Sequence, residues 1–221
     1  MTEEEVLESE QLNTGTSWTR NEDFDKFGYF PVERLWVPEE LYTPLPKVRG
    51  NMVWWGKRMD QFYYEKTEGQ VKGSLYRYYF PLYKYIHTGI SRKKEKIIGR
   101  KLYNTYYYDR FYLPGHELKL HTDRDACEIS VTMHVSSNCK NLWPFWVKTV
   151  SGEKHSIQLQ EGDAIIYKGC ERPHWREPLP REYEKKWFRT VEKEDLYYHQ
   201  VFFHYVLADG ERSHCAYDMS R

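Results

Sequence analysis

Residues 112–123 read Tyr112-Leu-Pro-Gly-His-Glu-Leu-Lys-Leu-His121-Thr-Asp123, and the interpretation of the whole chain starts from this stretch. Its last three residues form a His-x-Asp motif. Because residues two apart on an extended strand project to the same face, the imidazole of His121 and the carboxylate of Asp123 are predicted to lie side by side. They supply two of the three ligands of a two-histidine, one-carboxylate site, which leaves positions open on ferrous iron.

The residues around this motif supply a third ligand. A His-x-Asp pair alone is a weak signal in a chain with nine histidines. Downstream, however, residues 127–135 alternate polar and apolar side chains like a half-buried strand, and residues 161–167 form a Gly-Asp turn that opens an apolar strand. Pro173-His174-Trp175-Arg176 follows, and His174 is the predicted third ligand. His204, in the last β-rich segment, is its best rival.

The ordered set of Tyr112, Gly115, His121-x-Asp123, the Gly-Asp turn and His174 resembles the 2-oxoglutarate- and Fe(II)-dependent dioxygenases, specifically their prolyl-hydroxylase-like branch. The similar region covers about half of the chain, residues 106–206. The resemblance implies a double-stranded β-helix, or jelly roll, in which His121, Asp123 and His174 hold Fe(II). It also implies 2-oxoglutarate and O2 as co-substrates, release of succinate and CO2, and hydroxylation of a C–H bond. The expected substrate is peptidyl, with prolyl as one option, or a small amino-acid-like molecule.

The far carboxylate of 2-oxoglutarate requires a cation and hydroxyl donors, because an unpaired charge inside an apolar barrel is costly. Arg176 lies two residues after His174, so it is predicted to face the same interior and is the first choice for this role. Tyr112 matches the family tyrosine that hydrogen-bonds the co-substrate. Gln200 and Tyr106 are weaker candidates.

The chain departs from the family pattern at one point. The family's basic residue usually lies nine or ten positions beyond the distal histidine, where this chain has Tyr183 and Glu184. Either Arg176 takes over the role, or a residue of the charged insertion does; the candidates there are Lys185, Lys186 and Arg189.

Composition excludes several classes of protein. The chain has 221 residues with 33 basic and 33 acidic side chains, so no overall charge attracts nucleic acid or an anionic membrane. The four cysteines lack Cys-x-x-Cys spacing, which argues against a zinc ribbon and favours free thiols in a reducing cytosol. The sequence shows no apolar signal region and no run of membrane-spanning length. We therefore expect a cytoplasmic protein without a membrane or nucleic-acid partner; the oligomeric state is not predicted.

The predicted organisation is mainly β with flanking N-terminal helices. Residues 1–22 are expected to be a mobile acidic tail, residues 23–208 a single domain, and residues 209–221 a C-terminal tail. Within the domain, residues 23–104 form a helical or lid part and residues 105–208 the jelly-roll core. Eight core strands are predicted, at residues 102–113, 118–122, 127–136, 143–150, 155–159, 163–167, 174–177 and 200–206.

Outside the core the predictions are less detailed. Residues 24–32 are expected to form a strand and residues 38–42 a brief helix that begins with a proline. Helical spacing of apolar residues predicts one or two helices over 75–100, interrupted at Pro81. Residues 44–75 suggest a small strand pair or a lid. The charged insertion, residues 178–195, is interpreted as an exposed loop or short helix that covers a bound substrate.

Other functions remain open at this stage. A cupin-like protein or isomerase would hold a non-redox metal with the same three ligands and would have no need for Arg176 or Tyr112. A dioxygenase acting on nucleobases and an inactive binding module are further alternatives. Arg124 and Glu128 either orient the substrate or form a structural salt bridge.

Overall fold

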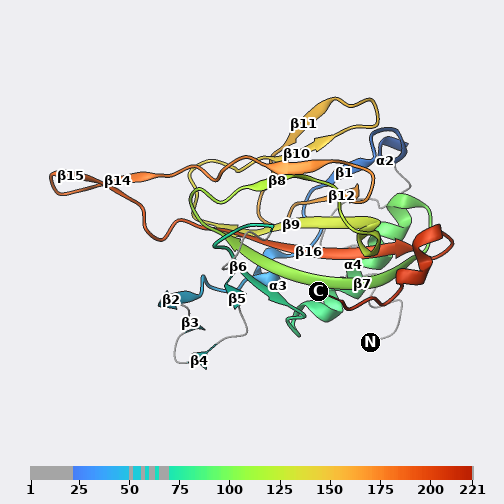
Figure 1. Ribbon diagram of the computed structural model, residues 1–221, viewed down its shortest axis with the longest axis horizontal. Coiled ribbons are helices and arrows are strands. Elements are labelled where there is room, and N and C mark those ends of the chain that lie inside the picture. Colours follow the sequence, from blue (N-terminus) through green and yellow to red (C-terminus); the bar gives the residue numbers. More distant parts are fainter. Residues whose placement is uncertain (1–21, 50–51, 56–57, 60–62, 65–69, 221) are drawn as a thin grey trace.

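Two antiparallel β-sheets packed face to face form the centre of this computed structural model, which describes residues 22–49, 52–55, 58–59, 63–64 and 70–220 (Figure 1). The main sheet has the strand order β1-β12-β9-β16-β7-β6-β5, and the smaller sheet has the order β11-β10-β13-β8. The main strands are β1 Tyr29–Val32, β5 Tyr63–Tyr64, β6 Leu75–Tyr78, β7 Leu102–Tyr112, β9 Ile129–Ser137, β12 Ala164–Lys168 and β16 Tyr198–Leu207. The smaller sheet contains β8 Leu118–His121, β10 Phe145–Lys148, β11 Lys154–Ile157 and β13 His174–Arg176. All eight predicted core strands are present, and the predicted jelly roll is confirmed.

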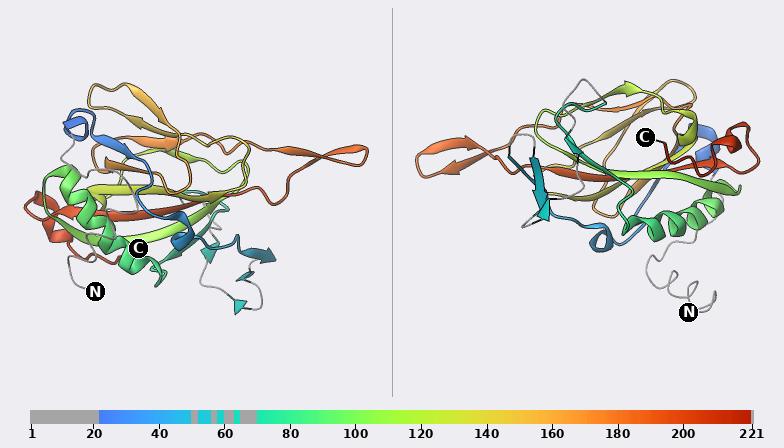
Figure 2. Two further views of the ribbon diagram at one scale, coloured as in Figure 1. Left: turned by 180° about the vertical axis from the view of Figure 1, so that it is seen from behind. Right: turned by 60° about the horizontal axis from the view of Figure 1, so that its bottom comes forward.

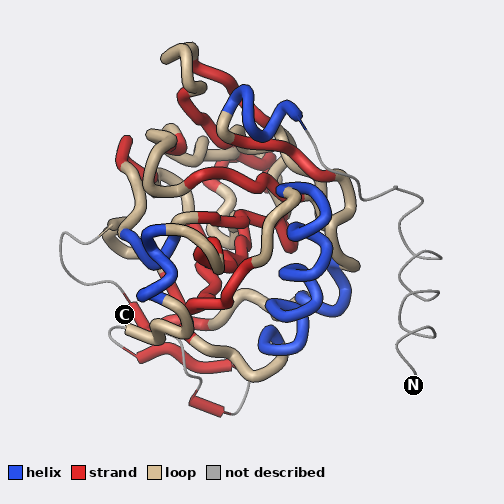
Figure 3. The backbone as a smooth tube through the Cα atoms, turned by 90° about the vertical axis from the view of Figure 1, so that its right-hand side faces the viewer, coloured by secondary structure: helices blue, strands red, loops and turns tan. Residues whose placement is uncertain are grey.

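The two faces of the main sheet serve different purposes. Alternate residues of a strand project to opposite faces, and Val201, Phe203 and Tyr205 on β16 belong to the apolar core that also contains Ile86 and Ile90 of the helix α4 (Tyr83–Ile98). Figure 2 shows this helix lying along the outer side of the main sheet, and Figure 3 shows it to one side of the strand layers. The alternate residues of β16 face the smaller sheet; they are Tyr198, Gln200, Phe202 and His204.

Two segments of the N-terminal half differ from the predictions. Residues 22–27 form a short helix, α2 (Glu22–Phe27), and only the second half of the predicted strand is extended, as β1. Residues 75–78 form β6, which pairs with β7, so the helix predicted there is wrong. In β6 Leu75 and Arg77 are buried, whereas Tyr76 and Tyr78 are half-buried. This alternation has the two-residue period of a strand. One helix, α4, begins after Pro81. The brief predicted helix is confirmed as α3, Pro38–Leu41.

The charged insertion forms a β-hairpin, not a loop or helix. Strands β14 (Tyr183–Lys186) and β15 (Arg189–Glu192) pair with Lys186 opposite Arg189. Figure 1 shows this hairpin, in orange, projecting well beyond the rest of the fold. It follows β13 from the Arg176 end of that strand and extends away from the two sheets.

The remaining segments are short. A three-stranded sheet comprises β2 Lys47–Arg49, β3 Met52–Trp55 and β4 Arg58–Met59, in line with the strand pairing expected in this region. The 3-10 helices η1 (Asp125–Cys127) and η2 (Glu211–Cys215) follow β8 and β16. The predicted acidic tail lies outside the described residues apart from Glu22. Within the described part of the chain, no helix has the length and apolar character needed to cross a bilayer.

A buried ion pair ties β6 to the middle of the main sheet. Arg77 donates to both carboxylate oxygens of Asp109, at 3.0 and 2.7 Å, and His199 Nε2 lies 2.9 Å from Asp109 Oδ2. All three side chains are fully buried. Burial alone would raise the pKa of Asp109, but Arg77 and His199 hold it below its usual range. The carboxylate is therefore charged inside the core.

Candidate metal site

Three side chains that are distant in sequence meet at one end of the smaller sheet. β8 ends at His121 and β13 begins at His174, and these two residues are direct antiparallel partners. Asp123 follows β8, and its amide donates to the carbonyl of Gly169 at 2.9 Å. Asp123 Oδ1 lies 3.5 Å from His121 Nε2 and 3.6 Å from His174 Nε2. The pairing of two strands and one loop contact thus brings two imidazoles and a carboxylate together.

Hydrogen bonds fix the orientation of both imidazoles. His121 Nδ1 donates to the carbonyl of Lys119 at 2.8 Å, and His174 Nδ1 donates to the carbonyl of Arg172 at 2.9 Å. Each ring therefore has its proton on Nδ1 and its lone pair on Nε2, the atom nearest Asp123. This tautomer is the one that a metal ligand requires.

The carboxylate of Asp123 is oriented in a similar way. Ser130 Oγ donates to Asp123 Oδ2 at 2.9 Å and lies 3.0 Å from His204 Nδ1, so Oδ1 faces the two histidines. Burial alone would raise the pKa of Asp123, but His174 and His121 hold it well below its usual range. Two imidazole nitrogens and one carboxylate oxygen are a ligand set that suits Fe(II), and the three residues fit such an ion.

Gly169 provides the space that Asp123 occupies. A Cβ at this position would lie 2.3 Å from the Cys127 carbonyl oxygen, 2.5 Å from Asp123 Oδ2 and 2.7 Å from Ser130 Oγ. No side chain is compatible with these distances. Neither Gly169 nor Ser130 was recognised in the sequence, because both act through contacts that only the folded chain creates.

The barrel interior next to His174 contains a buried arginine. Arg176 is 1% exposed, and it donates to the carbonyl of Trp143 and, at 3.4 Å, to Tyr198 Oη. Among the described residues no carboxylate lies within ion-pair distance of this guanidinium. A buried cation that contacts only neutral oxygens is energetically costly unless an anion joins it.

Other buried polar atoms near Arg176 have no hydrogen-bond partner among the described residues. They are Tyr112 Oη, His134 Nε2 and the Nε of Arg176 itself. The ring of Trp143 is 5.0 Å from that of Tyr112 and 5.3 Å from that of Tyr198, and His134 stacks on Tyr198 at 4.1 Å. Buried polar groups normally have hydrogen-bond partners, so this cluster fits a polar, anionic ligand. Of its members, Tyr198 and His134 were not predicted from the sequence.

The other predicted site residues make contacts of their own. Tyr106 Oη contacts Cys127 Sγ at 3.1 Å, and the Gln200 amide donates to Thr132 Oγ1 at 2.7 Å. His204, the rival ligand, lies behind Asp123, where its Nδ1 is 3.0 Å from Ser130 Oγ and its ring packs at a tilt against Tyr106. The alternative cations lie on the exposed β14–β15 hairpin; they are Lys185, Lys186 and Arg189.

Arg124 and Glu128 have structural partners. Arg124 pairs with Asp218 at 2.7 Å and donates to the carbonyl of Ser220. Glu128 accepts from the amide of Leu207 at 2.8 Å. Of the two roles considered for them, the structure favours the salt bridge, and these contacts attach the C-terminal segment to the loop after β8.

The mouth of the site is polar and aromatic. Gln70 links Arg110 to His121: its Oε1 accepts from Arg110 Nη1 at 3.0 Å, and its Nε2 donates to His121 Nε2 at 3.0 Å. A metal bound at His121 Nε2 would replace the second of these bonds. Arg110 Cζ lies 6.0 Å from the ring centre of Tyr76 and 5.6 Å from the ring centre of Tyr108. An amide, a guanidinium and the half-buried ring of Tyr76 thus lie near His121, whereas the buried ring of Tyr108 stacks on Phe202 at 4.4 Å.

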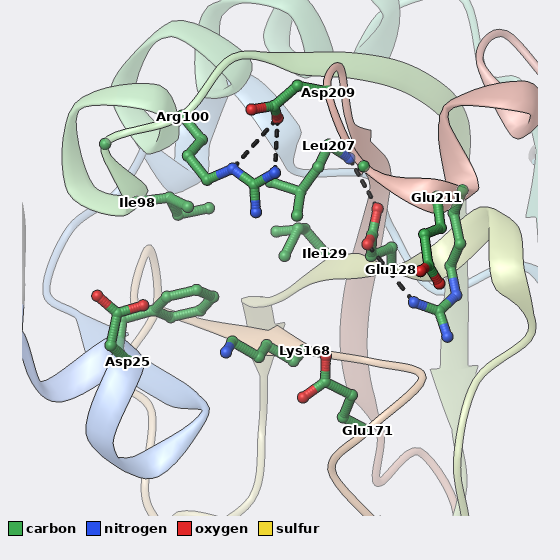
Figure 4. A pocket seen from close by; sticks show the side chains of 14 residues that line it. Asp25, Ile98, Arg100, Glu128, Ile129, Lys168, Glu171, Leu207, Asp209 and Glu211 are labelled. Atoms are coloured by element: carbon green, nitrogen blue, oxygen red, sulfur yellow. Dashed lines mark hydrogen bonds and ion pairs between the residues drawn. The ribbon is translucent and has the colours of Figure 1, made fainter.

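A separate surface pocket of about 630 Å³ lies between α2, the end of α4 and η2 (Figure 4). Four of its charged side chains form pairs: Arg100 with Asp209 at 2.7 Å, and Arg212 with Glu128 at 3.5 Å. None of the three candidate ligands lines it. The cavity is therefore a solvated surface cleft and not the candidate site.

Comparisons with known proteins show the fold. No protein-family model matches the sequence, and no curated protein is significantly similar to it. Among solved structures, a prolyl hydroxylase from Trichoplax adhaerens in complex with a hypoxia-inducible-factor peptide has a TM-score of 0.60 at 10% identity, over 100% of this chain and 98% of that one. A prolyl-4-hydroxylase from Pseudomonas putida has a TM-score of 0.53 at 10% identity, over 83% of this chain and 95% of that one. HygX from Streptomyces hygroscopicus, with nickel, 2-oxoglutarate and hygromycin B bound, has a TM-score of 0.56 at 9% identity, over 85% of this chain and 86% of that one. The chain shares the double-stranded β-helix fold with these structures.

Proposed function

We propose that this chain is an Fe(II)- and 2-oxoglutarate-dependent oxygenase that hydroxylates a C–H bond. The observation that carries the proposal is the convergence of two imidazole Nε2 atoms and one carboxylate oxygen, each with its other polar atom held by a hydrogen bond. His121, Asp123 and His174 would hold the iron on one side only and leave the remaining positions for ligands. The bound iron would supply the oxidising chemistry, with 2-oxoglutarate converted to succinate and CO2.

Arg176 is the proposed partner for the far carboxylate of 2-oxoglutarate. Its guanidinium lies on the same face of β13 as His174, is fully buried, and pairs with no described carboxylate. Tyr198 and Tyr112 would add hydroxyl donors, and Trp143 and Phe145 would exclude water from the interior. Gln200 remains a weaker candidate, since its amide nitrogen is bonded to Thr132. A non-redox metal protein would have no use for a buried, unpaired arginine.

The substrate class proposed is a peptide, with a prolyl residue as one option, or a small amino-acid-like molecule. The support is the surroundings of His121, where Gln70 and Arg110 bring N–H groups close to the candidate ligand and the half-buried ring of Tyr76 lies near the Arg110 guanidinium. Donors suit amide carbonyls and carboxylates, and ring faces suit the apolar part of the same molecule. A screen of proline-containing peptides and free amino acids, with succinate release as the readout, would distinguish the two groups.

An anaerobic titration tests the proposal. Addition of Fe(II) and then 2-oxoglutarate to the metal-free protein should produce the weak visible charge-transfer band of a 2-oxo acid chelated to iron. The His174→Ala variant should not give the band. If wild-type protein binds the metal but shows no band with 2-oxoglutarate, the oxygenase proposal is wrong and a cupin-like metal protein is favoured.

A further inference from the structure

The tip of the β14–β15 hairpin combines features that are unfavourable for a free hairpin. Trp187 and Phe188 form its two-residue turn and are 95% and 99% exposed. Trp187 has φ = 55°, a left-handed conformation that costs energy for a bulky side chain and that glycine usually provides in such turns. Below the turn, Lys186 lies opposite Arg189, and like charges in this position destabilise a strand pair.

These costs point to a ligand that covers the tip. Two large, almost fully exposed rings, a left-handed turn residue and two cations on facing strand positions occur within four consecutive residues. Local choices that conflict with stability are characteristic of functional positions. Lys186 Nζ already lies 2.7 Å from Glu184 Oε1, on the inner side of the hairpin. The ligand must therefore offer apolar volume to the rings and negative charge to Arg189 and to the outer side of Lys186.

The order of residues along the hairpin identifies the chemistry of that ligand. The rings are at the apex, Lys186 and Arg189 form the next layer, and Lys185 opposite Thr190 forms the layer below. Acidic residues come only further down, with Glu184 opposite Val191 and Glu192 opposite Tyr183. A bilayer with anionic lipids has the same order of layers, since aromatic rings enter at headgroup depth and Lys and Arg meet the phosphates above them.

We propose that the β14–β15 tip docks on the surface of a membrane that contains anionic lipids. Trp187 and Phe188 enter the interface, and Lys185, Lys186 and Arg189 contact the headgroups. A protein partner fits less well, because a stable protein interface buries roughly 1,200 Å² or more and the projecting tip offers only a few residues. Contact through a hairpin tip requires no membrane-spanning segment.

Co-sedimentation with vesicles tests this inference. Full-length protein should pellet with vesicles of equimolar phosphatidylcholine and phosphatidylserine, and at least roughly tenfold less with phosphatidylcholine alone, because each headgroup contact of a Lys or Arg contributes to affinity. The double variant Trp187→Ser/Phe188→Ser should bind the mixed vesicles at least roughly tenfold more weakly than wild type. The charge variant Lys185→Ser/Lys186→Ser/Arg189→Ser, which removes all three proposed headgroup contacts, should bind mixed vesicles no better than wild type binds phosphatidylcholine.

A matched control and a spectroscopic readout make the test specific. Val150→Ser removes another exposed apolar side chain, 59% exposed and outside the hairpin, and should bind like wild type. The vesicle-induced blue shift of tryptophan emission should decrease in Trp187→Phe. The proposal is overturned if wild type stays in the supernatant, if the Trp187→Ser/Phe188→Ser variant pellets like wild type, or if the tip instead mediates a dimer or binds a single-stranded oligonucleotide in preference to vesicles.

Discussion

Ser130 donates its hydroxyl hydrogen to Asp123 Oδ2 at 2.9 Å, on the side of the carboxylate that faces away from the two histidines. The bond fixes the rotation of the carboxylate, so that Oδ1 is the atom presented to a metal. Loss of a residue that hydrogen-bonds a metal ligand typically lowers metal affinity by about 10- to 100-fold.

Ser130→Ala should therefore weaken Fe(II) binding by about 10- to 100-fold without unfolding the protein. Ser136→Ala is the matched control, because Ser136 is a buried serine on the same strand and its side chain does not contact Asp123. Calorimetric titration with the metal under anaerobic conditions measures both. Equal affinities for the two variants would contradict this role of Ser130.

Gly169→Ala should disturb the same carboxylate from the other side. The added methyl group would lie 2.5 Å from Asp123 Oδ2, so the side chain or the loop must move. We expect a loss of metal affinity of at least roughly tenfold. Gly152→Ala, where no atom lies within 4 Å of the added methyl, should retain wild-type affinity. An unchanged metal affinity in Gly169→Ala would show that the loop adapts freely.

Arg176→Ala should weaken 2-oxoglutarate binding and leave metal affinity almost unchanged. Removal of one partner of a buried charge pair costs about 2–4 kcal/mol, which corresponds to roughly 30- to 1,000-fold in Kd. Arg212→Ala removes a surface arginine that pairs with Asp125 and serves as the control. The dependence of the charge-transfer band on 2-oxoglutarate concentration gives the Kd for 2-oxoglutarate of each variant. Wild-type affinity in Arg176→Ala would assign the far carboxylate to another residue.

The buried pair of Arg77 and Asp109 should be important for stability. Arg77→Met would leave the Asp109 carboxylate in the core without its main cation, which should lower the free energy of unfolding by about 3–5 kcal/mol. Arg100→Ala breaks an exposed pair with Asp209 and should change stability far less. Denaturant unfolding followed by circular dichroism compares the two variants. Similar midpoints for both would mean that the core accommodates the free carboxylate.

Acid should destabilise the fold through two buried histidines. Burial lowers the pKa of His87 to about 3 and that of His134 to about 4, from an ordinary value of 6.5. Between pH 6.5 and 4 the unfolded chain binds a proton at each of these two positions that the folded chain does not bind, so stability falls as the pH falls through this window. These two groups alone should contribute roughly 2.7 kcal/mol per pH unit to the slope. Burial also lowers the pKa values of His116 and His204 to about 4, and both residues add to the same slope.

Unfolding curves at a series of pH values measure this slope. His87→Gln retains an N–H donor for the carbonyl of His204, so it should lower the slope by about one proton without abolishing the fold. A stability that does not change between pH 6.5 and 4 would show that neither imidazole is neutral in the folded protein.

The parts of the site that were predictable depend on short sequence spacing. The two-residue spacing of His121 and Asp123 placed both beside one strand end, and the same spacing put Arg176 on the face of His174. Ser130, Gly169 and Tyr198 were not predictable, because their contacts depend on how β9, β12 and β16 are arranged in the sheets. A serine or glycine in a strand-rich sequence carries no sign of the side chain that it will meet.

The errors in the fold prediction have identifiable causes. The apolar face of a helix was predicted from the spacing of Leu75, Tyr78, Tyr79 and Leu82. Residues 75–78 instead pair with β7. Local propensity does not show that β7 has an edge available for pairing. In the insertion, charged residues occupy both faces of β14 and β15. Alternation of apolar and polar residues, on which strand prediction depends, is therefore missing there.

The two faces of strand β16 determine which mutations in this strand the fold can tolerate. Its even-numbered residues from Tyr198 to His204 line the barrel, while Val201, Phe203 and Tyr205 hold the sheet to α4. Inserting or deleting one residue would exchange the two sets and place polar groups against the helix. Substitutions at even positions, in contrast, alter the barrel lining and leave the helix contacts intact. Libraries aimed at new ligand preferences should therefore vary alternate positions of this strand and keep its length constant.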